Sequence, residues 1–149
     1  MRAFAPGGLS GFGPNINLLK DPRYGRNSEL AGEDPVLAGE YAVAYLKGMQ
    51  QWAGEGSGAR VKMNAYVKHY TAYGVETDRF NFVSNVTQFT FWDSYLPQYE
   101  MAFRDGGAAG AMCSYFAPNG ISVCGNSWLL NGVLRSPQGW NRSDAVVES

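Results

Sequence analysis

Lys68 and His69 are the adjacent pair best suited to chemistry, and His69 is the only histidine of the chain. They end an apolar run, from Arg60 to Tyr70, whose alternation predicts a strand. Neighbouring strand residues point to opposite faces, so both side chains reach one ligand only if the strand ends or kinks there. An ammonium group and an imidazole suit the vicinal hydroxyls of a sugar. The alternative is a surface lysine beside a structural histidine.

Arg23 and Arg26 flank Tyr24-Gly25 in a loop that contains several charged residues. A guanidinium fork binds two hydroxyls or orients a carboxylate. Both arginines could instead pair with nearby acidic residues and hold the loop together. We expect one arginine to do each job.

Arg79 and Tyr115 are two further candidates for the same site. Arg79 lies beyond Lys68 in a loop, and its alternative role is an ion pair with Asp78 or Glu76. Tyr115 ends a small, apolar strand-like segment, and its alternative role is a ring in the core.

Composition limits the class of protein. The 149 residues are 45% hydrophobic and 17% charged, with a net charge of −1 and no basic block. This predicts a globular domain and argues against electrostatic binding of nucleic acid or an anionic membrane. No apolar run approaches the roughly 20 residues of a membrane span. The first eight residues do not resemble a signal peptide.

Apolar runs alternate with helical patterns along the chain. Strands are predicted over residues 12–19, 60–70 and 108–115, and helices over 88–104 and 126–134. A further helix begins with Asp34 as N-cap and Pro35 at its first position, and ends near Trp52. Its predicted buried face holds seven residues: Val36, Leu37, Tyr41, Ala44, Tyr45, Gly48 and Met49. Pro97 should interrupt the helix over 88–104.

These elements amount to about three βα units and the start of a fourth. Alternating strands and helices predict an α/β fold with a parallel sheet. A closed (β/α)8 TIM barrel needs about 250 residues, so this chain predicts a partial one.

Four ordered motifs resemble the N-terminal domain of family 3 glycoside hydrolases, closest to the β-xylosidase and β-glucosidase branch. The motifs are Asn15–Glu29, Glu33-Asp34-Pro35, Val67-Lys68-His69-Tyr70 and Ala111–Tyr115. The resemblance implies that residues 1–149 are a fragment of that barrel domain. It implies a parent enzyme that releases terminal, non-reducing β-D-xylosyl or β-D-glucosyl residues with retention, without metal or cofactor.

The resemblance also assigns roles. Arg26, Lys68, His69 and Arg79 would hold the hydroxyls of a small carbohydrate, and Arg23 would be structural. Tyr115 would lie below the sugar and support the nucleophile. The family usually has Asn where this chain has Phe116.

The resemblance assigns neither of the two catalytic carboxylates to the residues named so far. The family nucleophile is an aspartate after a Val-x-Ser stretch, and Val147-Glu148-Ser149 matches that stretch. The nucleophile is therefore expected just after Ser149, with Asp144 as the alternative. The acid/base would come from a later region. We expect the chain alone to be inactive or nearly so.

Several alternatives stay open on sequence alone. The chain could be a non-catalytic carbohydrate-binding remnant, or a truncated product that aggregates through its strand edges. Cys113 and Cys124 could form a disulfide or remain free thiols. Two glycosylation sequons, at Asn85 and Asn141, slightly favour a secreted parent. Xylose and glucose are not separated.

Overall fold

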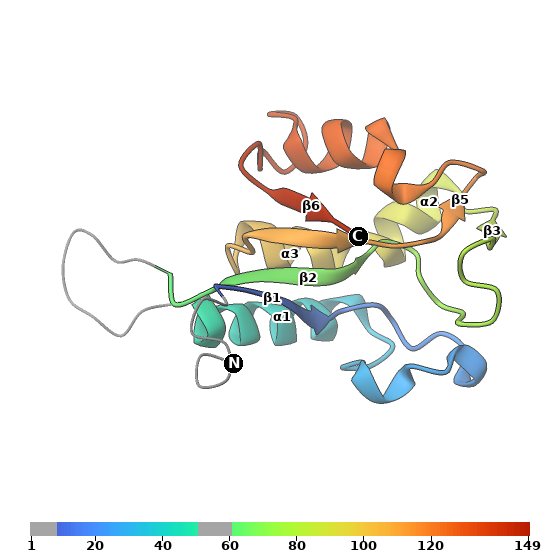
Figure 1. The fold of residues 1–149 in the computed structure, drawn as a ribbon, viewed down its shortest axis with the longest axis horizontal. Helices are drawn as coiled ribbons and strands as arrows, with labels where there is room; N and C mark the ends of the chain where they lie inside the picture. The colour runs from blue at the N-terminus through green and yellow to red at the C-terminus, as the bar shows by residue number, and fades with distance from the viewer. Residues whose placement is uncertain (1–8, 51–60) are drawn as a thin grey trace.

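The computed structural model describes residues 9–50 and 61–149. Its main sheet has four parallel strands: β1 (Ser10–Asn15), β2 (Asn64–Tyr70), β4 (Gly110–Cys113) and β6 (Val146–Glu148). They lie in the order β1-β2-β4-β6, which is their order along the chain (Figure 1). Neighbouring parallel strands in chain order are the arrangement of a barrel wall. The predicted α/β fold, a partial barrel, is confirmed.

Helices connect these strands. The longer helical elements are α1 (Pro35–Gln50), α3 (Pro97–Arg104) and η5 (Trp128–Arg135, a π-helix). The shorter ones are η1 (Pro22–Tyr24), η2 (Asn27–Glu29), α2 (Gln88–Thr90), η3 (Phe91–Tyr95, a π-helix) and η4 (Val123–Gly125). A small second sheet pairs β3 (Val83–Ser84) with β5 (Ala117–Pro118), near the carboxyl ends of the main strands (Figure 1).

Two predicted helix signals are confirmed. The backbone N–H of Leu37 donates to Asp34 Oδ1 over 2.8 Å, so Asp34 caps α1 as its sequence position indicated. Pro97 begins α3 and separates it from η3, because proline has no N–H to continue the preceding helix. The predicted end of the first helix near Trp52 lies outside the described residues.

The predicted buried face of α1 was wrong. Val36, Leu37 and Tyr45 are exposed, while Ala38, Gly39, Ala42 and Leu46 are buried. A Cβ on Gly39 would come within hard contact of the Met101 side chain on α3. The two helices therefore approach through small side chains, and the larger apolar residues lie on the other side of α1.

The main core lies between the sheet and the helices. Ala65 and Val67 of β2 and Ala111 of β4 are fully buried there, together with Leu46 of α1 and Phe103 of α3. Alternate strand residues point to the opposite face, where Phe12 stays exposed. In a closed barrel that second face would line the interior.

A smaller apolar cluster lies under the loops at the carboxyl ends of the strands. It joins Tyr24, Tyr73 and Phe116, with Phe82 stacked on Phe116 at 4.5 Å between ring centroids. Phe116 is thus a packing residue of this cluster, and the loop after Tyr115 is held by ring contacts.

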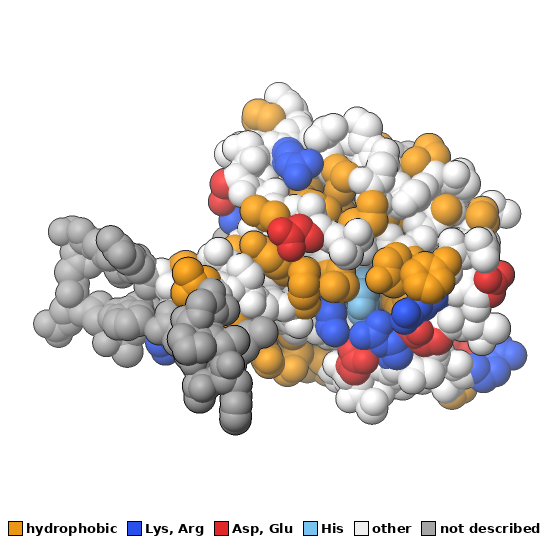
Figure 2. Space-filling view, in the orientation of Figure 1, with side chains coloured by type: hydrophobic (Ala, Val, Ile, Leu, Met, Phe, Trp, Pro, Cys, Tyr) orange, Lys and Arg blue, Asp and Glu red, His pale blue; other side chains and the backbone are white. Residues whose placement is uncertain are grey.

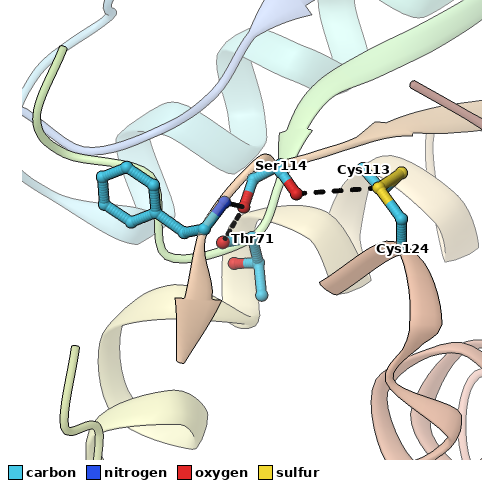
Figure 3. The surroundings of a disulfide bond; sticks show 5 residues. Thr71, Cys113, Ser114 and Cys124 are labelled. Atoms are coloured by element: carbon cyan, nitrogen blue, oxygen red, sulfur yellow. Dashed lines mark hydrogen bonds between the residues drawn. A yellow bond between two sulfur atoms is a disulfide. The ribbon is translucent and has the colours of Figure 1, made fainter. Parts of the chain in front are cut away.

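The loop after β4 is closed by a disulfide between Cys113 and Cys124, which decides a pairing that the sequence left open. Figure 3 shows Ser114 between this disulfide and Thr71. The Ser114 hydroxyl donates to the carbonyl of Thr71 over 2.9 Å and accepts from the N–H of Phe116. Tyr115 is therefore carried on a segment that is anchored on both sides.

Candidate functional site

The candidate site lies at the carboxyl ends of β1 and β2. In the sheet register Asn15 lies opposite Lys68, and Lys68 lies opposite Met112. The β2–β4 register shifts between Lys68 and Tyr70, so the strand is irregular at the point where a kink would let both side chains reach one ligand. The peptide bonds Lys68–His69 and Tyr70–Thr71 are cis. In Figure 2 the blue side chains of arginine and lysine lie close to the pale-blue side chain of the single histidine.

Arg26 is the central cation of this site. Its Nε and Nη2 donate to the two oxygens of the Glu29 carboxylate, over 2.8 and 3.0 Å. Its Nη1 lies 3.1 Å from His69 Nε2 and 3.4 Å from Glu76 Oε1. The side chain is 21% exposed, so it is held by its neighbours and still reaches solvent. Such bidentate pairing fixes the plane of a guanidinium.

Glu29 connects Arg26 to Lys68. Its Oε2 accepts from Asn15 over 3.0 Å and lies 3.4 Å from Lys68 Nζ. The hydrogen bond from Arg26, helped by Asn15 and the Lys68 charge, lowers the pKa of Glu29 to about 2. Glu29 is therefore an anion at neutral pH that is already committed to two cations. The Arg26–Glu29 pair is therefore the kind of contact, between a loop arginine and a nearby acidic residue, that the sequence left open as a way to hold the loop together.

Glu76 makes the corresponding connection on the other side of Arg26. It accepts from Tyr73 Oη over 2.8 Å and from Arg79 Nη1 over 3.0 Å. The Tyr73 and Glu76 groups raise the pKa of Arg79. We call the five charged residues Arg26, Glu29, Lys68, Glu76 and Arg79 the rim cluster.

Tyr115 joins this group through Arg79. The Arg79 guanidinium lies 5.4 Å from the centroid of the Tyr115 ring and 4.9 Å from that of Phe80. The rings of Phe80 and Tyr115 are 4.7 Å apart, and both are exposed. A cation beside two open rings gives the site an amphipathic wall.

His69 lies beneath this surface and is 4% exposed. Its Nδ1 is 3.1 Å from Asn17 Oδ1, and its ring is 4.9 Å from that of Tyr73. Burial, followed by the Arg26 and Lys68 charges, lowers the pKa of His69 to about 3. The imidazole is therefore neutral at physiological pH.

The structure thus brings Arg26, Lys68, His69, Arg79 and Tyr115 into one connected group. Arg23 lies outside it: it pairs with Asp21, and its side chain is 88% exposed.

Asp144 lies far from this group along the strand direction. It precedes β6, at the amino end of the sheet, and pairs with Arg142 over 2.9 Å. That ion pair lowers its pKa. Arg142 also donates to the carbonyls of Phe103 and Ala108, and we call this arrangement the Arg142 bracket. Asp144 therefore belongs to the bracket and makes no contact with the rim cluster in the hydrogen bonds and ion pairs of the described residues.

Within residues 9–50 and 61–149, no three His, Cys, Asp or Glu side chains are grouped so that they could hold a metal ion. The described helices include none long and apolar enough to cross a membrane.

A family model gives the site its context. The model of the glycosyl hydrolase family 3 N-terminal domain matches residues 3–146. The chain belongs to glycosyl hydrolase family 3. The predicted resemblance is therefore confirmed.

Curated relatives within family 3 include plant enzymes. A β-xylosidase/α-L-arabinofuranosidase from Medicago sativa subsp. varia is 44% identical over 94% of this chain. β-D-Xylosidase 3 from Arabidopsis thaliana is 42% identical over 94% of the chain. The chain spans 18% of the length of each of these relatives.

Solved family 3 structures share the fold. A GH3 exo-β-xylosidase in complex with a xylobiose aziridine probe has a TM-score of 0.84 at 31% identity. This match covers 95% of the chain and 18% of that enzyme. β-Glucosidase 3B from Thermotoga neapolitana has a TM-score of 0.80 at 30% identity, over 93% of the chain and 18% of that enzyme.

Sequence reasoning named Glu76 as an ion-pair alternative for Arg79, and the structure contains that pair. It missed Asn17 and the contact between Glu76 and Arg26. Asn17 contacts His69 through both atoms of its amide, and Glu76 connects Arg26 to Arg79. The signal for Asn17 was present, because two asparagines follow an apolar strand at its carboxyl end. The contact between Glu76 and Arg26 carried no such signal, since it depends on two loops meeting in space.

Proposed function

We propose that this chain forms the sugar-binding edge of a retaining β-glycosidase that acts on terminal β-D-xylosyl or β-D-glucosyl residues. The observation that carries the proposal is the convergence of Arg26, Lys68, His69, Arg79 and Tyr115 at the carboxyl ends of parallel strands. Ligands bind at this end of α/β barrels. The guanidinium and ammonium groups supply N–H donors for hydroxyls, and the rings of Phe80 and Tyr115 supply an apolar surface.

The proposal places the nucleophile directly after Ser149 in a longer parent enzyme. β6 runs parallel to β2, and Glu148 lies opposite Met112, which lies opposite Lys68. The chain following Glu148 therefore leads to the edge where the rim cluster lies. Glu29 and Glu76 are both bound by arginines, and Asp144 lies at the other end of its strand.

In this proposal the parent forms and then hydrolyses a glycosyl-enzyme, with the rim cluster holding the sugar as its ring flattens. The chain alone lacks both catalytic carboxylates and does not turn over substrate. The proposal includes no metal or cofactor.

The names of the relatives favour xylosyl substrates. The plant relatives at 44% and 42% identity are xylosidases, and the xylosidase structure has a higher TM-score than the glucosidase. The disulfide between Cys113 and Cys124 supports an extracellular location for the parent, because disulfides persist in oxidising compartments.

The test is an NMR titration of the 149-residue chain with methyl β-D-xyloside. We expect weak binding that is lost in Lys68→Met and kept in Arg23→Met, whose side chain is exposed and outside the rim cluster. Equal binding of the sugar by Lys68→Met and Arg23→Met would contradict the proposal.

A parallel assay uses an aryl β-xyloside and an aryl β-glucoside, and no turnover is expected. Turnover that Asp144→Ala abolishes would overturn the placement of the nucleophile. Binding without turnover in a longer protein that includes the residues after 149 would favour the alternative, a carbohydrate-binding remnant.

A further inference from the structure

The side-chain amide of Asn17 has only one orientation that satisfies its neighbours. Its Oδ1 lies 2.9 Å from the backbone nitrogen of His69, which can only donate. Its Nδ2 lies 2.9 Å from the carbonyl oxygen of His69, which can only accept. The hydroxyl of Tyr99 donates to the same carbonyl over 2.7 Å. The oxygen of Asn17 therefore faces His69.

This orientation fixes the proton of the His69 ring. Nδ1 lies 3.1 Å from the same Asn17 oxygen, so Nδ1 must carry the hydrogen of that contact. In a neutral imidazole the other nitrogen, Nε2, then presents a lone pair. Nε2 lies 3.1 Å from Arg26 Nη1, which is always a donor. The two ends of the ring lead independently to the same tautomer.

We propose that His69 is a positioning residue: as the Nδ1–H tautomer it accepts a hydrogen bond from Arg26 at Nε2 and aims that guanidinium, rather than donating to the sugar. The inference rests on the proposed function, in which Arg26 faces the carbohydrate. A proton on Nε2 would oppose the N–H of Arg26. The charged groups around the ring are Arg26, Lys68, Arg79 and Glu29.

The consequence for Arg26 is that it is held from three directions. Glu29 takes Nε and Nη2, while His69 and Glu76 take Nη1. A guanidinium has five N–H donors, so one hydrogen on Nη2 remains for a ligand. Lys68 has one partner among the described residues, Glu29, and keeps further donors for the same ligand.

The experiment is a long-range ¹H–¹⁵N correlation spectrum of the imidazole, which is unambiguous because the chain has a single histidine. We expect the hydrogen on Nδ1 from pH 5 to pH 8. A hydrogen on Nε2, or protonation of the ring near the ordinary pKa, would overturn the inference. The tautomer is read on the unmodified chain, so it does not depend on whether a variant folds.

Variants then test the contact with Arg26. Arg26→Gln should move the Nε2 resonance, because the charged donor is lost, while Arg26→Lys should restore part of the shift. Arg23→Gln is the matched control and should leave the resonance unchanged. An Nε2 signal insensitive to Arg26→Gln would contradict the positioning role.

Addition of methyl β-D-xyloside separates this inference from the proposed function. If the sugar binds, the Nδ1–H tautomer should persist, and a switch to Nε2–H on binding would overturn the inference alone. If the sugar does not bind, the proposed function is contradicted. The tautomer and the Arg26 contact, measured without sugar, still decide the role of His69.

Discussion

The two ends of the parallel sheet use arginine in different ways. At the amino end, Arg142 donates to the backbone carbonyls of Phe103 and Ala108 over 2.6 and 2.9 Å. At the carboxyl end, Arg26 bonds only to side chains, those of Glu29, Glu76 and His69. The two carbonyls that Arg142 binds are fixed by the course of the backbone. The partners of Arg26 are side chains, which have rotational freedom of their own. The comparison therefore separates a charge that supports the backbone from charges that hold one another at the edge where a ligand would bind.

The disulfide belongs to the carboxyl end and gives the largest expected effect. Cys124→Ser removes a cross-link that closes a loop of 11 residues. In the chain-entropy model this lowers the free energy of unfolding by about 3 kcal/mol. Cys124 itself is exposed, so the serine adds little cost of its own. Urea unfolding with and without reductant measures this.

In the disulfide experiment the variant is its own control. Reductant should destabilise the wild-type chain and leave Cys124→Ser unchanged. A wild-type chain that is indifferent to reductant would show that the carboxyl-end loop does not depend on the cross-link.

Arg142→Met tests the amino end. The substitution leaves two partly buried carbonyls without their donor, and each unsatisfied group costs about 1–3 kcal/mol. We expect a loss of about 2–3 kcal/mol in urea unfolding, with the binding of methyl β-D-xyloside unchanged where the variant is folded. Weakened sugar binding in folded protein would break the comparison between the two ends.

How much the sequence could predict depends on whether a feature rests on neighbouring residues or on residues far apart in the chain. Local signals succeeded: Asp34-Pro35 predicted the start of α1, Pro97 predicted the break before α3, and the alternation before Lys68 predicted β2. These features depend on residues a few positions apart, where backbone sterics and caps act.

Signals that depend on distant residues failed or stayed open. The buried face of α1 was misassigned because Gly39 meets Met101 of another helix, and a size-based pattern favours the larger apolar face. Glu76 was missed as a bridge, since Arg26 lies 50 residues earlier. The pairing of Cys113 with Cys124 stayed open, because it depends on where the loop folds back.

Acid should weaken the carboxyl end through His69. Its pKa falls from 6.5 to about 3 on folding, because burial comes first and the Arg26, Lys68 and Arg79 charges follow, opposed by Glu29. Below pH 6.5 the unfolded chain therefore binds a proton that the folded chain does not. The stability contributed by neutral His69 is complete above pH 6.5 and is lost as the pH falls toward 3.

We expect about 2 kcal/mol of this loss between pH 6.5 and pH 5. Urea midpoints across that range measure it, and His69→Gln, which has no titrating ring, should lack this component. Parallel pH profiles for the two proteins would contradict the buried, neutral state of His69.

Glu29→Gln sharpens the comparison within the rim cluster. The amide loses the charge that pairs with Arg26 and Lys68, but about a third of the Glu29 side chain is open to water, which screens the loss. We expect Glu29→Gln to lower the free energy of unfolding by about 0.5–1 kcal/mol at pH 7, measured by urea unfolding.

The pH dependence identifies the source of that difference. The folded pKa of Glu29 is about 2 against an ordinary 4.5, so its contribution is present above pH 4.5 and disappears as the pH falls toward 2. The variant and the wild type should therefore converge in acid. A gap that stays constant down to pH 2 would mean that packing, not charge, produced it.

Asp144→Asn has the smallest expected effect on stability. It also tests whether Asp144, the alternative nucleophile, takes part in binding the sugar. The carboxylate is 68% exposed, and its partner Arg142 keeps both backbone carbonyls when the charge is removed. We expect the free energy of unfolding, measured with urea, to fall by less than about 0.5 kcal/mol, as for exposed ion pairs in general. Methyl β-D-xyloside binding should be unaffected, because Asp144 precedes β6 while the rim cluster lies beyond the other ends of the strands. Loss of binding in a stably folded Asp144→Asn chain would move the ligand to the amino end and reverse the assignment of the two arginines.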